Sequence, residues 1–187
     1  MISAVLDACV LYSAALRDFL LRLAAADLVK PFWSEEIQNE WVRSLLRKRP
    51  DLKQENLERT RWEMNSYFPD SLIQGYESVI PTLQLPDLDD KHVLAVAIQT
   101  KAKYIVTFNL KDFPKSALLP YQVEAISPDN LILSIIKYNA KELVETVARH
   151  RANLSRPPKT VDEYLSTLEK QKLPKTVAFL REHKDEL

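Results

Sequence analysis

Acid and amide side chains recur at the predicted strand ends of this chain. Asp7 directly follows the apolar run 2–6, which predicts a buried strand. Asp90 begins a helical pattern that leads into the next predicted strand, and Asn109 and Asp112 follow that strand. Because functional side chains of an open parallel sheet gather outside the carboxyl ends of its strands, we expect these four side chains to lie close together.

Glu40 adds a further carboxylate to this group. It lies between Ile37 and Trp41 on the shoulder of an apolar helical face, which places its carboxylate near the core. Several carboxylates at one sheet edge would repel one another and raise each other's pKa values unless a cation lay between them. Hard oxygen ligands, with one cysteine and three histidines in the whole chain, favour Mg²⁺ or Mn²⁺ over zinc.

Each of these residues also has an ordinary structural interpretation. Asp7 and Asp90 are acceptable helix N-caps, a role worth about 1 kcal/mol. Glu40 alone is a common solvated helix residue, and Asp112 is a suitable turn residue before Pro114. The joint pattern, rather than any single residue, therefore supports the prediction of a metal site.

The composition removes several classes of enzyme. Gly75 is the one glycine among 187 residues, where average usage would give roughly 13. A glycine-rich phosphate loop, a dinucleotide-binding fingerprint and the nucleophile elbow of esterases each need more than one glycine. Any chemistry on phosphate must therefore use other groups.

Charge is balanced overall but uneven along the chain. Lys and Arg number 26, as do Asp and Glu, so no net field attracts nucleic acid or an anionic membrane. Residues 43–61 nevertheless hold seven basic and three acidic side chains, whereas residues 62–90 hold six acids and no Lys or Arg. Contact with a polyanion must therefore be local.

The chain has no feature that predicts secretion or membrane insertion. The lone Cys9 excludes an intramolecular disulfide and fits a reducing compartment. The first ten residues contain no Lys or Arg, and no uncharged run approaches the roughly 18 residues that a membrane helix needs. We expect a cytoplasmic protein that makes no contact with a membrane.

Strand and helix patterns alternate along most of the chain, which is typical of a parallel sheet covered on both faces. The predicted fold class is α/β, a three-layer α/β/α sandwich with a central parallel sheet, followed by C-terminal helices. The expected strands are 2–6, 104–108 and 123–126. The expected helices are 12–26, 34–49, 53–67, 90–101 and 130–138, with Pro31-Phe32-Trp33 as a connector and one short helix at most between 69 and 86.

The region after residue 138 has a different pattern. Three helical segments separated by Pro157-Pro158 and Pro174 follow, without strand patterns. We therefore predict two parts, a domain over residues 1–138 and a helical extension over 139–187 that packs on it.

Four motifs in this order resemble the PIN-domain nucleases, and within them the VapC toxin type. They are Val5-Leu6-Asp7, the segment 33–40 (WSEEIQNE), the segment 85–97 (LPDLDDKHVLAVA) and the segment 105–114 (IVTFNLKDFP). The resemblance covers roughly residues 2–136. The tail with Arg156-Pro157-Pro158 also resembles a C-terminal extension found in one subgroup.

The resemblance implies a metal-dependent endoribonuclease that cuts single-stranded RNA with one or two Mg²⁺ or Mn²⁺ ions. The expected RNA partner is single-stranded or structured. The first three acids of the family fall on Asp7, Glu40 and Asp90. The chain departs from the family at Asn109, where a typical member has Asp, and Asp112 could supply the missing charge.

The metal ligands expected from this resemblance are Asp7, Asp90, Asn109 and Asp112, and Glu40 would orient or deprotonate the attacking water. Thr107 is similar to the family's hydroxyl near the metal, with an ordinary strand residue as the alternative. Asp87 would support the site by capping a loop. His92 is expected at the surface of a helix start, with substrate contact as the alternative.

Arg43, Arg47, Lys48 and Arg49 lie beyond Glu40 on the same predicted helix and could follow an RNA backbone; the alternative is a solvated helix end stabilised by the helix dipole. The resemblance further implies a cognate antitoxin protein, whose tail would occupy the acidic cleft, and a homodimer.

Two other interpretations remain open at this point. A PIN-fold module that binds RNA or a protein without cutting is favoured by Asn109. Phosphatase or receiver-type chemistry also uses an Asp after a strand, but Asp7-Ala8-Cys9 lacks the Asp-x-Asp of the phosphatases, and receivers have an acid pair that is missing here.

Overall fold

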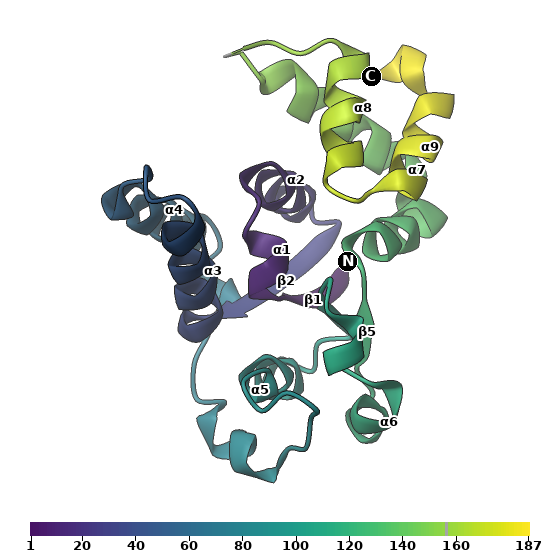
Figure 1. Ribbon diagram of the computed structural model, residues 1–187. Coiled ribbons are helices and arrows are strands. Elements are labelled where there is room, and N and C mark those ends of the chain that lie inside the picture. Colours follow the sequence, from purple (N-terminus) through teal and green to yellow (C-terminus); the bar gives the residue numbers. More distant parts are fainter. Residues whose placement is uncertain (156) are drawn as a thin grey trace.

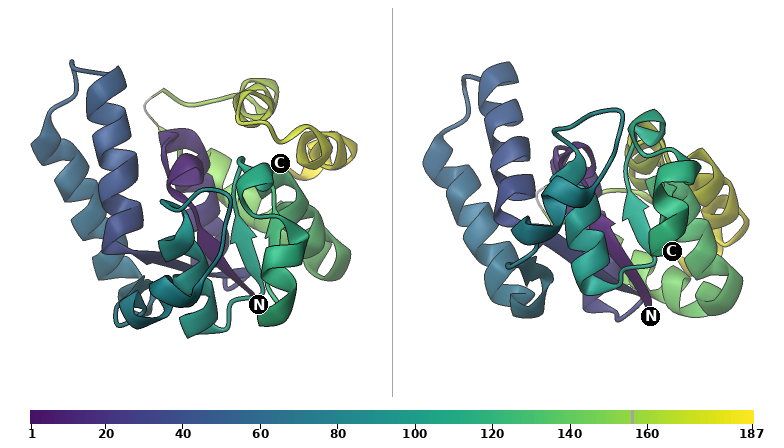
Figure 2. Two further views of the ribbon diagram at one scale, coloured as in Figure 1. Left: turned by 60° about the horizontal axis from the view of Figure 1, so that its bottom comes forward. Right: turned by 90° about the horizontal axis from the view of Figure 1, so that it is seen from below.

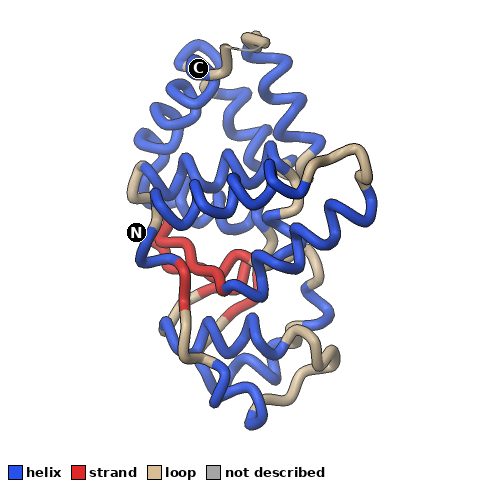
Figure 3. Tube along the Cα trace, turned by 90° about the vertical axis from the view of Figure 1, so that its left-hand side faces the viewer, coloured by secondary structure: helices blue, strands red, loops and turns tan. Residues whose placement is uncertain are grey.

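The computed structural model describes residues 1–155 and 157–187. Its centre is a five-stranded sheet, parallel throughout, with the strand order β3-β2-β1-β4-β5. The strands are β1 (Ile2–Leu6), β2 (Val29–Ser34), β3 (Leu72–Ile73), β4 (Tyr104–Val106) and β5 (Glu124–Ile126). Figure 3 shows these strands enclosed between helices.

Helices cover both faces of the sheet, as predicted. Helix α2 lies over one face and α5 over the other, while α3 and α4 form an antiparallel pair at the β2–β3 side (Figures 1 and 2). The helices of this part are α1 (Ala8–Leu11), α2 (Ala14–Ala25), α3 (Glu35–Lys48), α4 (Gln54–Tyr67), α5 (Lys91–Thr100) and α6 (Lys115–Leu118). The three-layer α/β/α prediction is confirmed.

The central strand β1 fixes where the sheet's functional edge lies. Its last three residues are completely buried or nearly so, and Leu6 is in register with Val106 of β4. The carboxyl ends of β1 and β4 therefore end side by side. Any side chains that follow these two strands are brought together at this edge.

One predicted element is wrong. The segment Pro31-Phe32-Trp33 is predicted to be a connector, but it lies inside β2, where proline cannot donate a ladder hydrogen bond. Strand β3 pairs only with Trp33 and Ser34, so Pro31 lies where β1 is the one neighbour of β2. Proline is tolerated at such an edge position.

Two boundaries also differ from expectation. The predicted helix 12–26 is two helices, α1 and α2, because Ser13 adopts an extended conformation between them. The short strand β3 falls in the proline-rich stretch where only a short helix was expected. With two residues, it is too short to produce an alternating pattern in the sequence.

The C-terminal region is helical, apart from an isolated bridge between Ser155 and Pro158, over the residues that the structure describes. It contains α7 (Pro128–Asn153), α8 (Val161–Lys170) and α9 (Pro174–Glu182). Helix α7 continues across the predicted division at 138/139 but has a non-helical residue, Asn139, at that point. The division into two parts stays a prediction, and Arg156 of the predicted tail motif lies outside the described residues.

Polar contacts fix this region to the sheet domain. His150 of α7 lies 2.8 Å from the Asp18 carboxylate of α2 through Nε2 and 2.9 Å from the Tyr164 hydroxyl of α8 through Nδ1. Within the region, the buried Asp129 carboxylate of α7 accepts hydrogen bonds from Thr176 at the start of α9. None of the described helices is both long and apolar enough to cross a bilayer.

Candidate active site

A cleft of about 700 Å³ opens beside the carboxyl ends of β1 and β4. It brings together Asp7, Glu40, Asp90 and Asn109, four of the residues that the sequence motifs single out. The full lining is Asp7, Ala8, Cys9, Tyr12, Glu40, Arg43, Ser44, Arg47, Lys48, Asp89, Asp90 and Asn109. Acids from three separate segments therefore meet in one hollow.

Asp7 is held rigidly at the end of β1. Its backbone N–H donates to the carbonyl of Val106, and its side chain is only 4% exposed. Carboxylate oxygen Oδ2 accepts hydrogen bonds from Thr107 Oγ1 at 2.6 Å and from Cys9 Sγ at 3.0 Å. These contacts orient a buried carboxylate that lines the cleft.

The N-cap interpretation fails for both aspartates. Asp7 precedes α1 and Asp90 precedes α5, but neither side chain makes a capping hydrogen bond. By contrast, Ser34 before α3 does cap its helix, through a bond from the N–H of Ile37. The two carboxylates are therefore not used by the helix ends they precede.

The pKa of Asp90 shows that the acids are electrostatically coupled. It is raised to about 7 by burial first, and then by the negative charges of Asp7, Asp87, Asp112 and Glu40. A carboxyl group that holds its proton near neutral pH is typical of acids gathered without a neutralising partner. The repulsion expected from the sequence is thus present, and a cation would relieve it.

Glu40 is held by a histidine whose role was not predicted. His92 Nε2 lies 3.1 Å from Glu40 Oε1, which joins α5 to α3. The expectation of a surface position is wrong, because the His92 side chain is buried. Burial opposes protonation, but the hydrogen bond and charge of Glu40 outweigh it and raise the pKa of His92. No local pattern could reveal this contact, since the partners are 52 residues apart.

Thr107 links the two strand ends. Its side chain is completely buried, and its hydroxyl both donates to Asp7 and accepts from the backbone N–H of Asn109 at 2.9 Å. Asn109 itself is exposed and lines the cleft. Thr107 therefore positions the loop that carries the Asn109 amide.

Asp112 and Asp87 lie outside the cleft lining. Asp112 ends a 3₁₀ turn, and its negative charge helps to raise the pKa of Asp90. Asp87 Oδ1 accepts a hydrogen bond from the N–H of Asp89 at 3.0 Å, which is the loop-capping contact expected for it. Both residues act on the cleft from its margin.

Basic side chains from α3 form one side of the cleft. Arg43 and Arg47 follow Glu40 at helical spacings of three and seven, which places all three on one face. Lys48 also lines the cleft, with Nζ 5.2 Å from the centroid of the Tyr12 ring. Arg49 does not, because α3 ends there and its guanidinium pairs with Asp51 at 2.6 Å.

The donor atoms fit a hard divalent cation in type but are not gathered into a finished site. The oxygens of Asp7, Asp90 and Asn109 are the ligands that Mg²⁺ or Mn²⁺ prefers. Among the described residues, however, no three His, Cys, Asp or Glu side chains converge as a metal-binding group. The raised pKa of Asp90 is the observation that favours a cation here.

Two other lining residues, Tyr12 at the end of α1 and Ser44 on α3, were not predicted from the sequence. Asp89 before α5, expected with Asp87 to support the site or cap a loop, also contributes to the cleft wall. Ser44 follows Glu40 by four positions, so helical spacing could have identified it.

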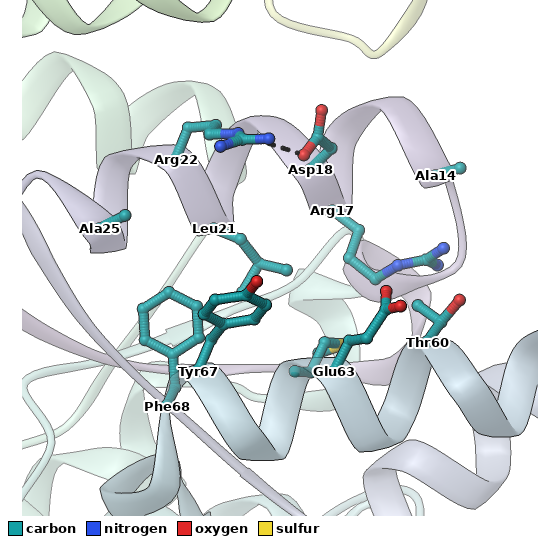
Figure 4. A pocket seen from close by; sticks show the side chains of 11 residues that line it. Ala14, Arg17, Asp18, Leu21, Arg22, Ala25, Thr60, Glu63, Tyr67 and Phe68 are labelled. Atoms are coloured by element: carbon teal, nitrogen blue, oxygen red, sulfur yellow. Dashed lines mark ion pairs between the residues drawn. The ribbon is translucent and has the colours of Figure 1, made fainter.

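A second hollow of about 730 Å³ lies between α2 and α4 (Figure 4). It contains an ion pair between Asp18 and Arg22, and apolar side chains such as Leu21, Tyr67 and Phe68. None of the motif residues lines it. The two hollows have similar volumes. Among the described residues, the carboxylates that raise the pKa of Asp90 gather at the cleft beside β1 and β4 and not at the second hollow.

Comparison with known proteins agrees with this geometry. Residues 3–111, more than half of the chain, match the model of the PIN domain. The chain belongs to the PIN-domain family. Residues 128–182 of this PIN-domain protein match the model of the VapC50 C-terminal domain, which identifies the helical extension as one of the VapC type.

One curated relative supports the same assignment. A segment of 59 residues is 46% identical to a protein of Mycobacterium tuberculosis (strain ATCC 25618 / H37Rv) with the name "Putative ribonuclease VapC50". The match spans 32% of this PIN-domain protein and 34% of that relative, about a third of each. No solved structure matches the chain significantly.

Proposed function

We propose that this PIN-domain protein is a metal-dependent endoribonuclease that hydrolyses phosphodiester bonds of single-stranded RNA. The observation that supports this most strongly is the cleft whose lining combines the acids Asp7, Glu40 and Asp90 with the basic side chains of Arg43 and Arg47. Acidic side chains alone would repel an RNA strand. Basic side chains alone would bind the strand without hydrolysing it. Their combination in one hollow suits a phosphate group held beside a site that activates water.

Asp7, Asp90 and Asn109 would hold Mg²⁺ or Mn²⁺, with Asp112 contributing charge from the margin. When bound, the cation supplies positive charge against the carboxylates and the scissile phosphate. Because Thr107 and Cys9 both donate to one oxygen of Asp7, that carboxylate is already oriented. Preorganised charge of this kind costs no reorganisation during the reaction.

Glu40 would orient the attacking water and accept its proton. His92 holds the Glu40 carboxylate in place through Oε1, which leaves Oε2 free for the water. Attack by water on phosphorus, in line with the leaving 3′ oxygen, leaves a 5′-phosphate and a 3′-hydroxyl. A reaction through the ribose 2′-hydroxyl would instead leave a cyclic phosphate, so the product ends distinguish the two routes.

Arg43, Arg47 and Lys48 would bind phosphates of the RNA backbone, with Arg49 as a further candidate beyond the cleft. Their contacts carry no base information and give affinity that falls with salt.

The match to a VapC-type ribonuclease supports a role as the toxin of a toxin–antitoxin pair, and we propose that the protein acts in the cytoplasm. A cognate antitoxin would silence the enzyme by placing a segment in the acidic cleft, and the active form would be a homodimer. Co-expression with the product of a short neighbouring reading frame should give a stable complex without ribonuclease activity. Size-exclusion chromatography with light scattering would measure the oligomeric state.

The alternative is a PIN-fold module that binds RNA or a protein without cutting it. Asn109 favours this alternative, because a neutral amide neutralises less of a second cation than the family's usual aspartate would. The incomplete convergence of the acids favours it as well.

Cleavage of varied single-stranded RNAs by the purified protein decides between the two functions. We expect cleavage with Mn²⁺ or Mg²⁺, loss of cleavage with chelator, and loss in Asp7→Asn and Asp90→Asn. Asp185→Asn, an exposed aspartate outside the cleft, is the matched control and should cut normally. Cleavage that survives both cleft substitutions would reject this site, and binding without cleavage would establish the module.

A further inference from the structure

The turn between α8 and α9 contacts the sheet domain beside the cleft. Ser13 Oγ donates a hydrogen bond of 2.5 Å to Gln171 Oε1 in this turn. Ser13 directly follows Tyr12, which lines the cleft. In Figure 1 the turn lies at the end of α8 and α9 that is directed toward the sheet domain. The extension therefore reaches the rim of the candidate active site.

A second contact places a positive charge at the same rim. Lys172, the next residue of the turn, has its Nζ 5.1 Å from the centroid of the Phe108 ring. Phe108 directly precedes Asn109, another lining residue of the cleft. The turn thus touches the margins of the cleft at two points, one after α1 and one after β4.

The turn is held in a fixed conformation. Lys172 adopts a left-handed conformation with φ of 62°, and its N–H donates to the carbonyl of Glu169. Leu173 is completely buried, which anchors the chain directly after the turn. The Lys172 side chain nevertheless remains exposed. A rigid backbone therefore presents a solvated ammonium group at the edge of the cleft.

Lys172 and Lys48 have similar surroundings, Lys48 in the lining of the cleft and Lys172 at its rim. Each ammonium group lies over an aromatic ring, Phe108 for Lys172 and Tyr12 for Lys48. Neither lysine forms an ion pair with a carboxylate among the described residues. Both charges are thus available to an anionic ligand.

We propose that the α8–α9 turn forms one wall of the RNA-binding cleft and that Lys172 contacts a backbone phosphate of the strand. This inference rests on the proposed ribonuclease function. A single strand that crosses the cleft would meet Arg43, Arg47 and Lys48 in its lining and Lys172 at its rim. The C-terminal extension is then part of the substrate site in addition to its packing role.

Binding of fluorescently labelled single-stranded RNA to the full chain tests this wall. A Glu40→Gln background prevents cleavage, and affinity is measured over a series of salt concentrations. Lys172→Gln should weaken binding several-fold for every RNA sequence and should reduce the salt slope by roughly 0.7, the value for one phosphate contact on a single strand. Lys172→Glu should weaken binding further, and Lys172→Arg should restore it.

Lys141→Gln is the matched control, because Lys141 is also an exposed lysine of the extension but lies on α7. It should leave affinity and salt slope unchanged. If Lys172→Gln and Lys172→Glu bind RNA normally while Arg47→Gln binds it more weakly, the α8–α9 turn is not part of the RNA-binding cleft. The proposed ribonuclease function would still stand. If even the parent chain binds no RNA, both the proposed function and this inference fail.

Discussion

Thr107 Oγ1 donates a 2.6 Å hydrogen bond to Asp7 Oδ2 and so joins the ends of β4 and β1 across 100 residues of sequence. The two strands end in register, and the hydroxyl lies completely buried between them. A donor in this position holds the carboxylate in one orientation. The contact makes the β-sheet itself responsible for the geometry of the site.

Replacing Thr107 should therefore affect the reaction more than the fold. Thr107→Val keeps the shape but removes the donor, which leaves Cys9 as the remaining side-chain donor to Asp7 Oδ2. We expect slower single-turnover cleavage and a loss of about 1 kcal/mol in the free energy of unfolding, measured in urea. Thr107→Ser retains the hydroxyl and should retain most of the rate. Equal rates for the valine variant and the parent would contradict a positioning role.

Glu40 and His92 should act as one unit. His92→Leu removes the partner of Glu40 Oε1, so we expect kcat to fall roughly tenfold, the effect of about 1.4 kcal/mol, with little change in KM. Glu40→Gln should be slower still. If His92 acts only through Glu40, the double variant will be no slower than Glu40→Gln alone. Additive losses in this cycle would show that His92 has an independent role.

The raised pKa of Asp90 predicts a stability that depends on pH and metal. An acid whose pKa is raised to about 7 in the folded protein, from 3.8, destabilises it when ionised. The cost is absent below pH 4, grows as pH rises from about 4 to 7, and is complete above that range. Without metal, Asp90→Asn should therefore melt at a higher temperature than the parent at pH 8, by the equivalent of roughly 1 kcal/mol after solvent screening.

The same experiment contains its own controls. The difference between Asp90→Asn and the parent should shrink at pH 5, where the parent's Asp90 is largely protonated. Mn²⁺ at pH 8 should raise the melting temperature of the parent and have little effect on Asp90→Asn. Asp185→Asn should match the parent throughout. A parent that is as stable at pH 8 as Asp90→Asn, without metal, would show that the acids are not strained together.

The sequence predicts the site better where its residues follow strands than where they meet across helices. The positions of Asp7 and Asn109 could be predicted because parallel strands end at one edge of the sheet. The strands themselves are recognisable as short apolar runs in the sequence. The pairing of Glu40 with His92 depends on how α3 packs on α5, for which no local pattern exists. The strand at Pro31-Phe32-Trp33 could not be predicted, because the tolerance of Pro31 in β2 depends on how short β3 is.

The extension shows the same limit. Its helices follow from their apolar spacing, but its contact with the cleft depends on a single turn. Gln171 and Lys172 have no pattern that distinguishes them from other polar residues at a helix end. Only the folded chain brings this turn to Ser13 and Phe108.

Removal of residues 139–187 should expose part of the sheet domain that is now covered. Phe19 of α2 is completely buried, and its ring stacks on His150 of α7 with a centroid distance of 6.0 Å. The truncated chain would lose this cover and the hydrogen bond from His150 to Asp18, so apolar surface would face water. We expect lower solubility, increased binding of a hydrophobic dye and a lower melting temperature. Asp18→Asn in the full chain removes only the charge of the contact and should cost about 1 kcal/mol. A truncated chain as soluble and as stable as the parent would show that the extension is dispensable for the fold.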